Sequence, residues 1–97
     1  MGDVGYLPKE VRDSADLQRY FEDKLKEWER SKGEKAHKTL VAKLINWGSR
    51  APGATLWDAL KNQILFQAER QKISRWQFVD NLFQQENADM FMALLQA

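Results

Sequence analysis

Residues 39–60, TLVAKLINWGSRAPGATLWDAL, decide the fold, because they encode two helices and the turn that separates them. The first of these helices is expected over residues 34–47. Its inward residues recur at spacings of three and four, and they are Ala36, Leu40, Val41, Leu44 and Ile45. The helix is expected to end at Trp47-Gly48, since glycine readily takes the left-handed conformation just past a helix C-terminus.

The turn and the start of the next helix follow from the rest of this stretch. Pro52-Gly53 cannot continue a helix and favours a turn. Thr55 then caps a helix that runs to about Gln71, and Asp58, three residues later, completes a capping box. The residues expected to face inward on this helix are Trp57, Leu60, Ile64, Leu65 and Ala68.

Towards the N-terminus, we expect residues 1–6 to be flexible and Pro8 to open a short first helix. Ser14 or Asp16 caps a second helix, whose apolar stripe consists of Leu17, Tyr20, Phe21, Leu25 and Trp28. The segment Ser31-Lys32-Gly33 interrupts this pattern and is expected to end the helix.

Towards the C-terminus, Ser74 and Gln77 form a capping box, and Ile73 with Phe78 supplies a hydrophobic staple. The helix that they start carries Phe78, Val79, Leu82 and Phe83 on one side. Asn87 caps a last short helix with Met90, Phe91, Leu94 and Leu95. The pattern predicts an all-α fold, a single domain of residues 1–97 in which five or six short antiparallel helices surround one core.

The composition restricts the class of protein. The 97 residues contain no cysteine, which excludes disulfides and thiolate zinc sites. The chain has neither a secretory signal pattern nor an apolar run long enough for a membrane span. We therefore expect a soluble, cytoplasmic domain without membrane attachment.

The sequence contains no pattern typical of catalysis. His37 is the only histidine, and it lies between lysines with no other metal-ligand pattern nearby. The carboxylates of the 22–29 segment lie beside lysines on one exposed helix, as in surface ion pairs. No phosphate-binding glycine loop or dinucleotide fingerprint is present. We expect no enzymatic activity, no metal and no cofactor.

Tryptophan leaves two alternatives open. Trp28, Trp47, Trp57 and Trp76 occupy inward or helix-end positions, which favours the core or its rim, while a half-exposed tryptophan is also a typical interface anchor. Met90, Phe91 and Met92 likewise belong either to the core or to an adaptable binding surface.

One family resemblance covers residues 26–65. The segment resembles the middle and C-terminal part of a death domain, in which a helix ends in Trp, a polar turn follows, and a pair such as Ala-Thr opens the next helix. The matching residues are Leu44, Trp47, Ala54, Thr55, Leu56 and Leu60, although the Leu56–Leu60 spacing is one residue longer than in that family. The resemblance implies a death-fold-like helical bundle and a cytoplasmic signalling adaptor that oligomerises through homotypic contacts.

The charge distribution fits such an adaptor. Net charge is +1, but the 19–43 segment is rich in lysine and arginine, whereas residues 77–97 contain only acidic charges. The basic residues expected to bind a protein partner, whether a second copy or a related domain, are Arg30, Lys32, Lys35, Lys38, Arg50 and Lys61. The acidic residues expected to receive them are Asp80, Glu86 and Asp89. The alternatives are a small helical subunit of a nucleic-acid-associated complex, for which +1 is a small charge, and a structural subunit of another protein complex.

Overall fold

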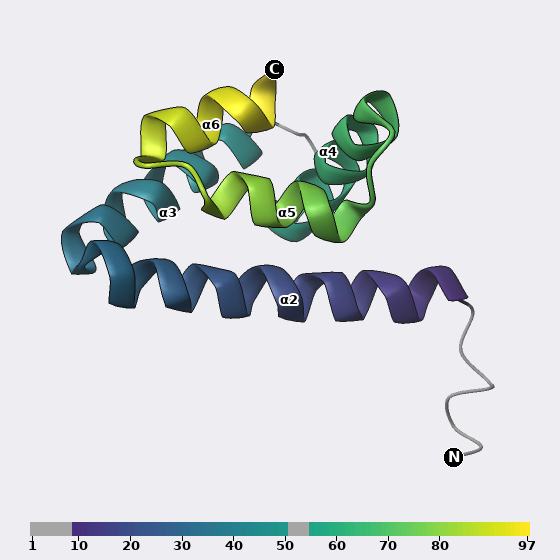
Figure 1. The fold of residues 1–97 in the computed structure, drawn as a ribbon, viewed down its shortest axis with the longest axis horizontal. Helices are drawn as coiled ribbons and strands as arrows, with labels where there is room; N and C mark the ends of the chain where they lie inside the picture. The colour runs from purple at the N-terminus through teal and green to yellow at the C-terminus, as the bar shows by residue number, and fades with distance from the viewer. Residues whose placement is uncertain (1–8, 51–54) are drawn as a thin grey trace, which may run out of the picture.

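Five α-helices and no strand make up the part of the chain that the structure describes, and the predicted all-α class is confirmed. This computed structural model describes the backbone of residues 9–50 and 55–97 and the side chains of residues 15–50 and 55–97. The helices are α2 (Lys9–Lys32), α3 (Glu34–Gly48), α4 (Leu56–Gln71), α5 (Arg75–Phe83) and α6 (Ala88–Gln96) (Figure 1). The predictions for residues 1–6, Pro8 and Pro52-Gly53 lie outside the described residues.

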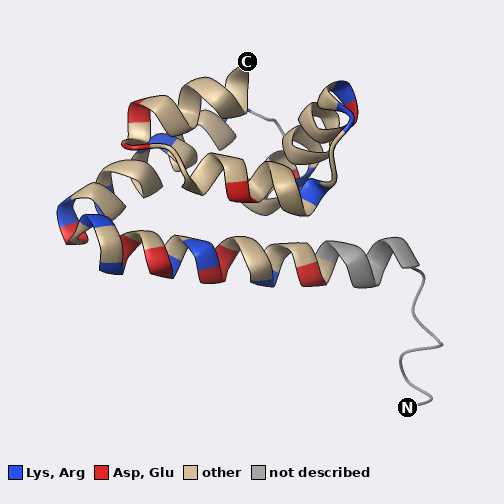
Figure 2. Ribbon diagram, viewed as in Figure 1, with Lys and Arg blue, Asp and Glu red and all other residues tan. Residues whose placement is uncertain are grey.

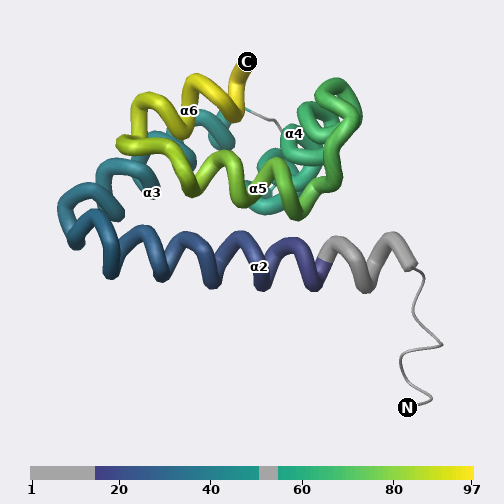
Figure 3. The backbone as a smooth tube through the Cα atoms, in the orientation of Figure 1, coloured from purple at the N-terminus to yellow at the C-terminus, as the bar shows by residue number. Residues whose placement is uncertain are grey.

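The long helix α2 runs along one side of a compact bundle, and the shorter helices cover its inner face (Figure 1). Figure 3 shows the chain reversing direction where α2 meets α3. Helix α2 packs against α3, α4 and α5, and α6 packs against α3, α4 and α5 from the far side. The helices therefore enclose one core.

Helix α2 differs from the prediction at its start. It is one continuous helix from Lys9 to Lys32, so neither Ser14 nor Asp16 caps a separate helix. The reason is that the segment holds no glycine or proline, and serine and aspartate inside a helix cost at most about 0.7 kcal/mol each relative to alanine, so the helix continues through them. The predicted end is confirmed, since Gly33 follows α2 with φ +99°, a conformation that favours glycine.

The predicted left-handed conformation of Gly48 is wrong. Gly48 is the last residue of α3, and Ser49 follows it with φ −66°. What Gly48 provides is space, because a Cβ there would lie 2.5 Å from Leu56 Cδ1. The start of α4 is as predicted. The Asp58 backbone N–H donates to Thr55 Oγ1 at 3.1 Å, and the Thr55 N–H donates to the Asp58 carboxylate at 3.4 Å.

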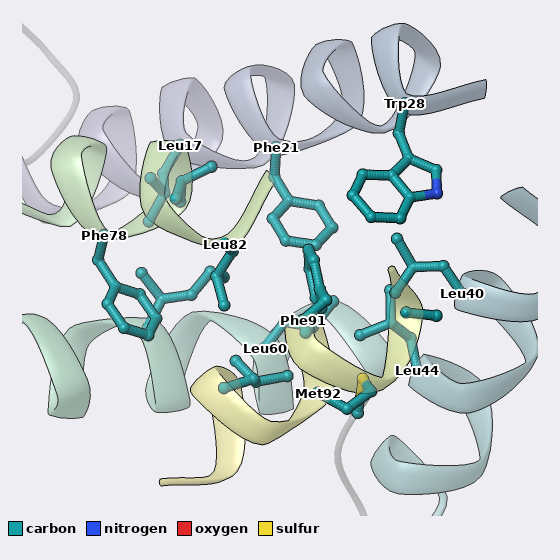
Figure 4. Close-up of a cluster of buried hydrophobic side chains, with 14 of the residues drawn as sticks. Leu17, Phe21, Trp28, Leu40, Leu44, Leu60, Phe78, Leu82, Phe91 and Met92 are labelled. Atoms are coloured by element: carbon teal, nitrogen blue, oxygen red, sulfur yellow. The ribbon is translucent and has the colours of Figure 1, made fainter. Parts of the chain in front are cut away.

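Aromatic rings from three helices, α2, α5 and α6, fill the centre of the core (Figure 4). Phe21 and Trp28 of α2 reach inward to meet Phe83 of α5 and Phe91 of α6. The ring centroids of Phe83 and Phe91 are 5.0 Å apart, and those of Phe21 and Phe83 are 5.1 Å apart, both with edge-to-face geometry. Leu17, Leu40, Leu44, Leu60, Ile64, Phe78, Val79, Leu82 and Leu95 complete the core.

One residue predicted to face inward, Ile45, is exposed, and so is Met90, which the sequence left open between the core and a binding surface. The side chain of Ile45 is 53% exposed and that of Met90 is 44% exposed, whereas Met92 and Phe91 are buried. Helical spacing places Ile45 and Met90 at the edges of their stripes, where a neighbouring helix decides whether they are covered. Trp28 lies in the core, and the other three tryptophans are half-buried against it.

The caps of α5 and α6 are confirmed, with one difference. Ser74 accepts a hydrogen bond from the Gln77 backbone N–H at 3.0 Å, but the Gln77 side chain donates to Asn81 instead of reaching back. Asn87 Oδ1 accepts from the Met90 backbone N–H at 2.9 Å. The Ser74–Gln77 capping box is therefore half formed, and the predicted Asn87 cap is present.

One buried polar residue was missed. Gln67 of α4 is fully buried, and its Nε2 donates to the carbonyls of Leu95 at 3.3 Å and Ala97 at 2.5 Å. Gln63 donates to the same Leu95 carbonyl at 2.7 Å. These bonds satisfy carbonyls that the end of α6 leaves unpaired. Two glutamines thus fix the end of α6 to α4.

Candidate interaction surfaces

A groove separates the outer face of α3 from the turn between α5 and α6. We call it the charged groove; its volume is about 550 Å³, and the charged residues that line it are Lys32, Lys35, Lys43, Glu86 and Asp89. Gly33 positions the lysines because the chain turns there to begin α3. Asn87 positions the carboxylates because it caps α6 immediately after Glu86. The structure therefore brings predicted basic and acidic site residues to one face of the molecule.

The charges of this groove are only partly used within the chain. Lys43 Nζ lies 2.9 Å from an Asp89 carboxylate oxygen. Lys32 Nζ lies over the Trp28 ring, 5.5 Å from its centroid. Neither Lys35 nor Glu86 has an ion-pair partner among the residues that the structure describes. Among the described residues, Lys35 and Glu86 are thus the groove charges with neither an ion pair nor a ring contact.

Asp80, the third predicted acidic site residue, lies elsewhere and binds within the chain. It joins α5 to α2, where it accepts a hydrogen bond from the Tyr20 hydroxyl at 2.5 Å and lies 3.5 Å from Lys24 Nζ. The hydrogen bond to Asp80 raises the pKa of Tyr20, and burial and the negative charge of Asp80 act in the same direction. The Tyr20 and Trp76 rings also pack against each other at nearly a right angle, with centroids 5.5 Å apart.

Lys24 takes part in the same contact. Burial alone would lower the pKa of Lys24, but attraction to Tyr20, Asp80 and Glu27 outweighs it, so the pKa is raised. Glu27 lies 3.8 Å from the lysine nitrogen. Asp80 is therefore engaged in a contact that fixes α5 to α2.

The remaining predicted site residues lie outside the charged groove. Lys38 lies on α3, with its Nζ 3.0 Å from the carboxylate of Glu34. Arg30 is exposed in the last turn of α2, and Arg50 is exposed just after α3. Lys61 lies half-exposed on α4. None of these four residues lines the charged groove with Glu86.

A second groove, of about 280 Å³, lies where α2, α3 and the start of α4 meet. We call it the apolar groove; Leu25, Val41, Leu56 and Trp57 form its half-buried walls. Phe21 and Leu44 lie at its base, and Gln18 and Glu22 of α2 lie at its edge. Sequence reasoning placed Leu25, Val41 and Trp57 inward, but not Leu56, and it missed the groove, since spacing does not tell which inward residue stays half-exposed.

No group of three or more histidine, aspartate or glutamate side chains that could hold a metal ion occurs among the described residues. His37 Nδ1 lies 3.8 Å from a Glu29 carboxylate oxygen, in a surface pair between α3 and α2. None of the helices in the described part of the chain combines the length and the apolar character that crossing a membrane requires.

Comparison of the chain with protein-family models, with curated proteins and with solved structures finds no match. The fold itself, a compact all-α globule, agrees with the bundle that the sequence predicts. The finer resemblance to death domains stays a prediction.

Proposed function

We propose that this chain is a non-catalytic protein–protein interaction domain that associates with a second copy of itself or a related helical domain through charge-complementary surfaces. The observation that carries the proposal is the charged groove, in which Lys35 and Glu86 lie on opposite walls and have no ion-pair partner among the described residues. The death-domain resemblance supports the same class, that of cytoplasmic signalling adaptors.

The positions of the two charges suggest how copies pair. Lys35 and Glu86 line the same groove, so a two-fold axis through it brings each Lys35 opposite the Glu86 of the other copy. Two ion pairs then form for one contact. The net charge of +1 adds little overall repulsion between copies.

Salt and charge reversal test this function. Light scattering at increasing protein concentration should show a rising average mass, and added salt should lower it, because exposed charges are screened. Lys35→Glu should weaken self-association. Lys26→Glu, which reverses an exposed α2 lysine outside the groove, is the matched control and should leave association unchanged. A monomer at every concentration and salt would contradict self-association.

Nucleic-acid binding is the second candidate, and one observation favours it. Figure 2 shows lysine and arginine gathered where α2 meets α3, a corner that carries Arg30, Lys32 and Lys35. Glu29 and Glu34 lie in the same corner and reduce its positive charge. Oligonucleotides of single-stranded and duplex type separate the two functions: a salt-sensitive mobility shift of a monomeric protein would favour this alternative.

A further inference from the structure

The apolar groove has the size and lining to receive an aromatic side chain. Its walls come from three helices, so it is a fixed feature of the packing and not the surface of one helix. A cavity of about 150 Å³ lined by apolar side chains is enough to bind benzene, and this groove measures about 280 Å³. A phenyl ring therefore fits it.

The edge of the groove adds a charge preference. Glu22 lies at this edge and has no ion-pair partner among the described residues; the Gln18 amide donates to it at 3.4 Å. An occupant that carries a cation beside its aromatic ring would pair with this carboxylate. An aromatic residue with a nearby lysine or arginine therefore suits both the apolar lining and the carboxylate at the edge.

The same chain exposes such a pair on α4. The side chain of Phe66 is 56% exposed, which is the largest exposed fraction among the large apolar side chains of the described residues. Arg70 lies one turn further on, with its guanidinium carbon 5.9 Å from the Phe66 ring centroid. Like Glu22, Arg70 has no ion-pair partner among these residues.

Phe66 cannot enter the groove of its own molecule. Helix α4 lines that groove with its first residues, ending at Leu60. Phe66 lies about 9 Å further along the helix axis and about 120° around it, as the rise and turn of an α-helix require. The fitting groove is therefore that of another copy.

We propose that Phe66 and Arg70 of one copy dock into the apolar groove of a second copy, with the ring between Leu25, Val41 and Trp57 and the guanidinium on Glu22. This rests on the proposed self-association but uses other residues than Lys35 and Glu86. Phe66 and Arg70 lie on a different surface from the apolar groove, so a docked pair of copies keeps one free Phe66–Arg70 surface and one free apolar groove. Further copies can therefore add at either end. Together with the two-fold contact it carries assembly beyond a dimer.

The docking is tested by measuring the average mass of each variant by light scattering over the same series of protein concentrations. Native protein should grow beyond twice the monomer mass, whereas Phe66→Ala should stop at the dimer held by the charged groove. The affinity of the Phe66→Ala variant for the apolar groove should fall about tenfold or more, as when other buried anchor residues are truncated. Phe66→Leu, which keeps an apolar anchor, should retain much of the growth. Phe66 is exposed, so these variants should fold as the native chain does.

A charge swap tests the second half of the contact. Arg70→Glu and Glu22→Arg should each weaken growth several-fold, and the double variant should recover it. Lys72→Glu, an exposed change of the same size two residues away, is the matched control and should have little effect. Native growth in Phe66→Ala, or no recovery in the double variant, would overturn the docking. A native protein that stays monomeric would instead overturn the proposed function and the docking with it.

Discussion

The α2–α5 contact and the charged groove combine the same side-chain types with opposite results. Between α2 and α5, Asp80 is bound by both Tyr20 and Lys24. Across the charged groove, Lys43 pairs with Asp89, while Lys35 and Glu86 have no ion-pair partner within the part of the chain that the structure describes. The comparison teaches that acidic residues grouped by sequence have different uses: Asp80 fixes the fold, and Glu86 remains available to a partner.

The largest expected effect comes from the core that both regions share. Phe91→Ala removes a fully buried ring next to Phe83 and Trp28 and should lower the free energy of unfolding by about 3–5 kcal/mol. Denaturant unfolding measures it. Phe66→Ala is the exposed control and should stay within about 0.5 kcal/mol of the native chain. Equal losses in the two variants would contradict the assigned core.

The next largest effect is expected from a variant that weakens the α2–α5 contact alone. Tyr20→Phe removes the hydroxyl that donates to Asp80 and should cost about 1 kcal/mol of stability. Self-association should not change, because Tyr20 lies outside the charged groove. A variant with native stability and weaker association would reverse the roles given to the two regions.

A smaller effect is expected at alkaline pH. The pKa values of Tyr20 and Lys24 are both raised above their ordinary values of 10.0 and 10.5, so the folded state holds these protons more tightly than the unfolded state. This stabilisation is complete below about pH 10 and is lost as pH rises through the folded pKa values. Unfolding midpoints of native and Tyr20→Phe proteins from pH 8 to 11 should converge; a constant difference would contradict it.

The smallest effect concerns the pair within the charged groove. Lys43→Ala removes a partly exposed ion pair with Asp89 and should change stability by at most about 1 kcal/mol, less in high salt. Thermal unfolding at low and high salt measures it. A loss of stability as large as that of Tyr20→Phe and independent of salt would contradict the distinction between the charged groove and the α2–α5 contact.

Local signals in the sequence predicted much of the fold. The Thr55 and Asn87 caps depend on residues three apart, and the stripe of α2 depends on spacings of three and four, so no distant contact was needed to find them. The same local reasoning failed at Ser14 and at Gly48. A possible cap does not end a helix that can continue, and a glycine also serves close packing, here against Leu56.

The surfaces depend on contacts between distant residues, which periodicity does not encode. Sequence reasoning grouped Asp80 with Glu86 by charge, but Tyr20, sixty residues earlier, separates their roles. It placed Ile45 inward, while packing leaves this side chain exposed. It did not find Phe66, whose position off the α4 stripe is visible in the sequence and could have identified it as an exposed aromatic residue.

One measurement tests the central claim, that opposite charges of the charged groove join copies of the chain. The average mass of Lys35→Glu, Glu86→Lys and their equimolar mixture is compared by light scattering at equal total concentration. Each variant alone places like charges across the contact and should have a lower mass than the native protein, whereas the mixture restores both ion pairs and should regain the native mass. A mixture that stays at the mass of the single variants would contradict the claim.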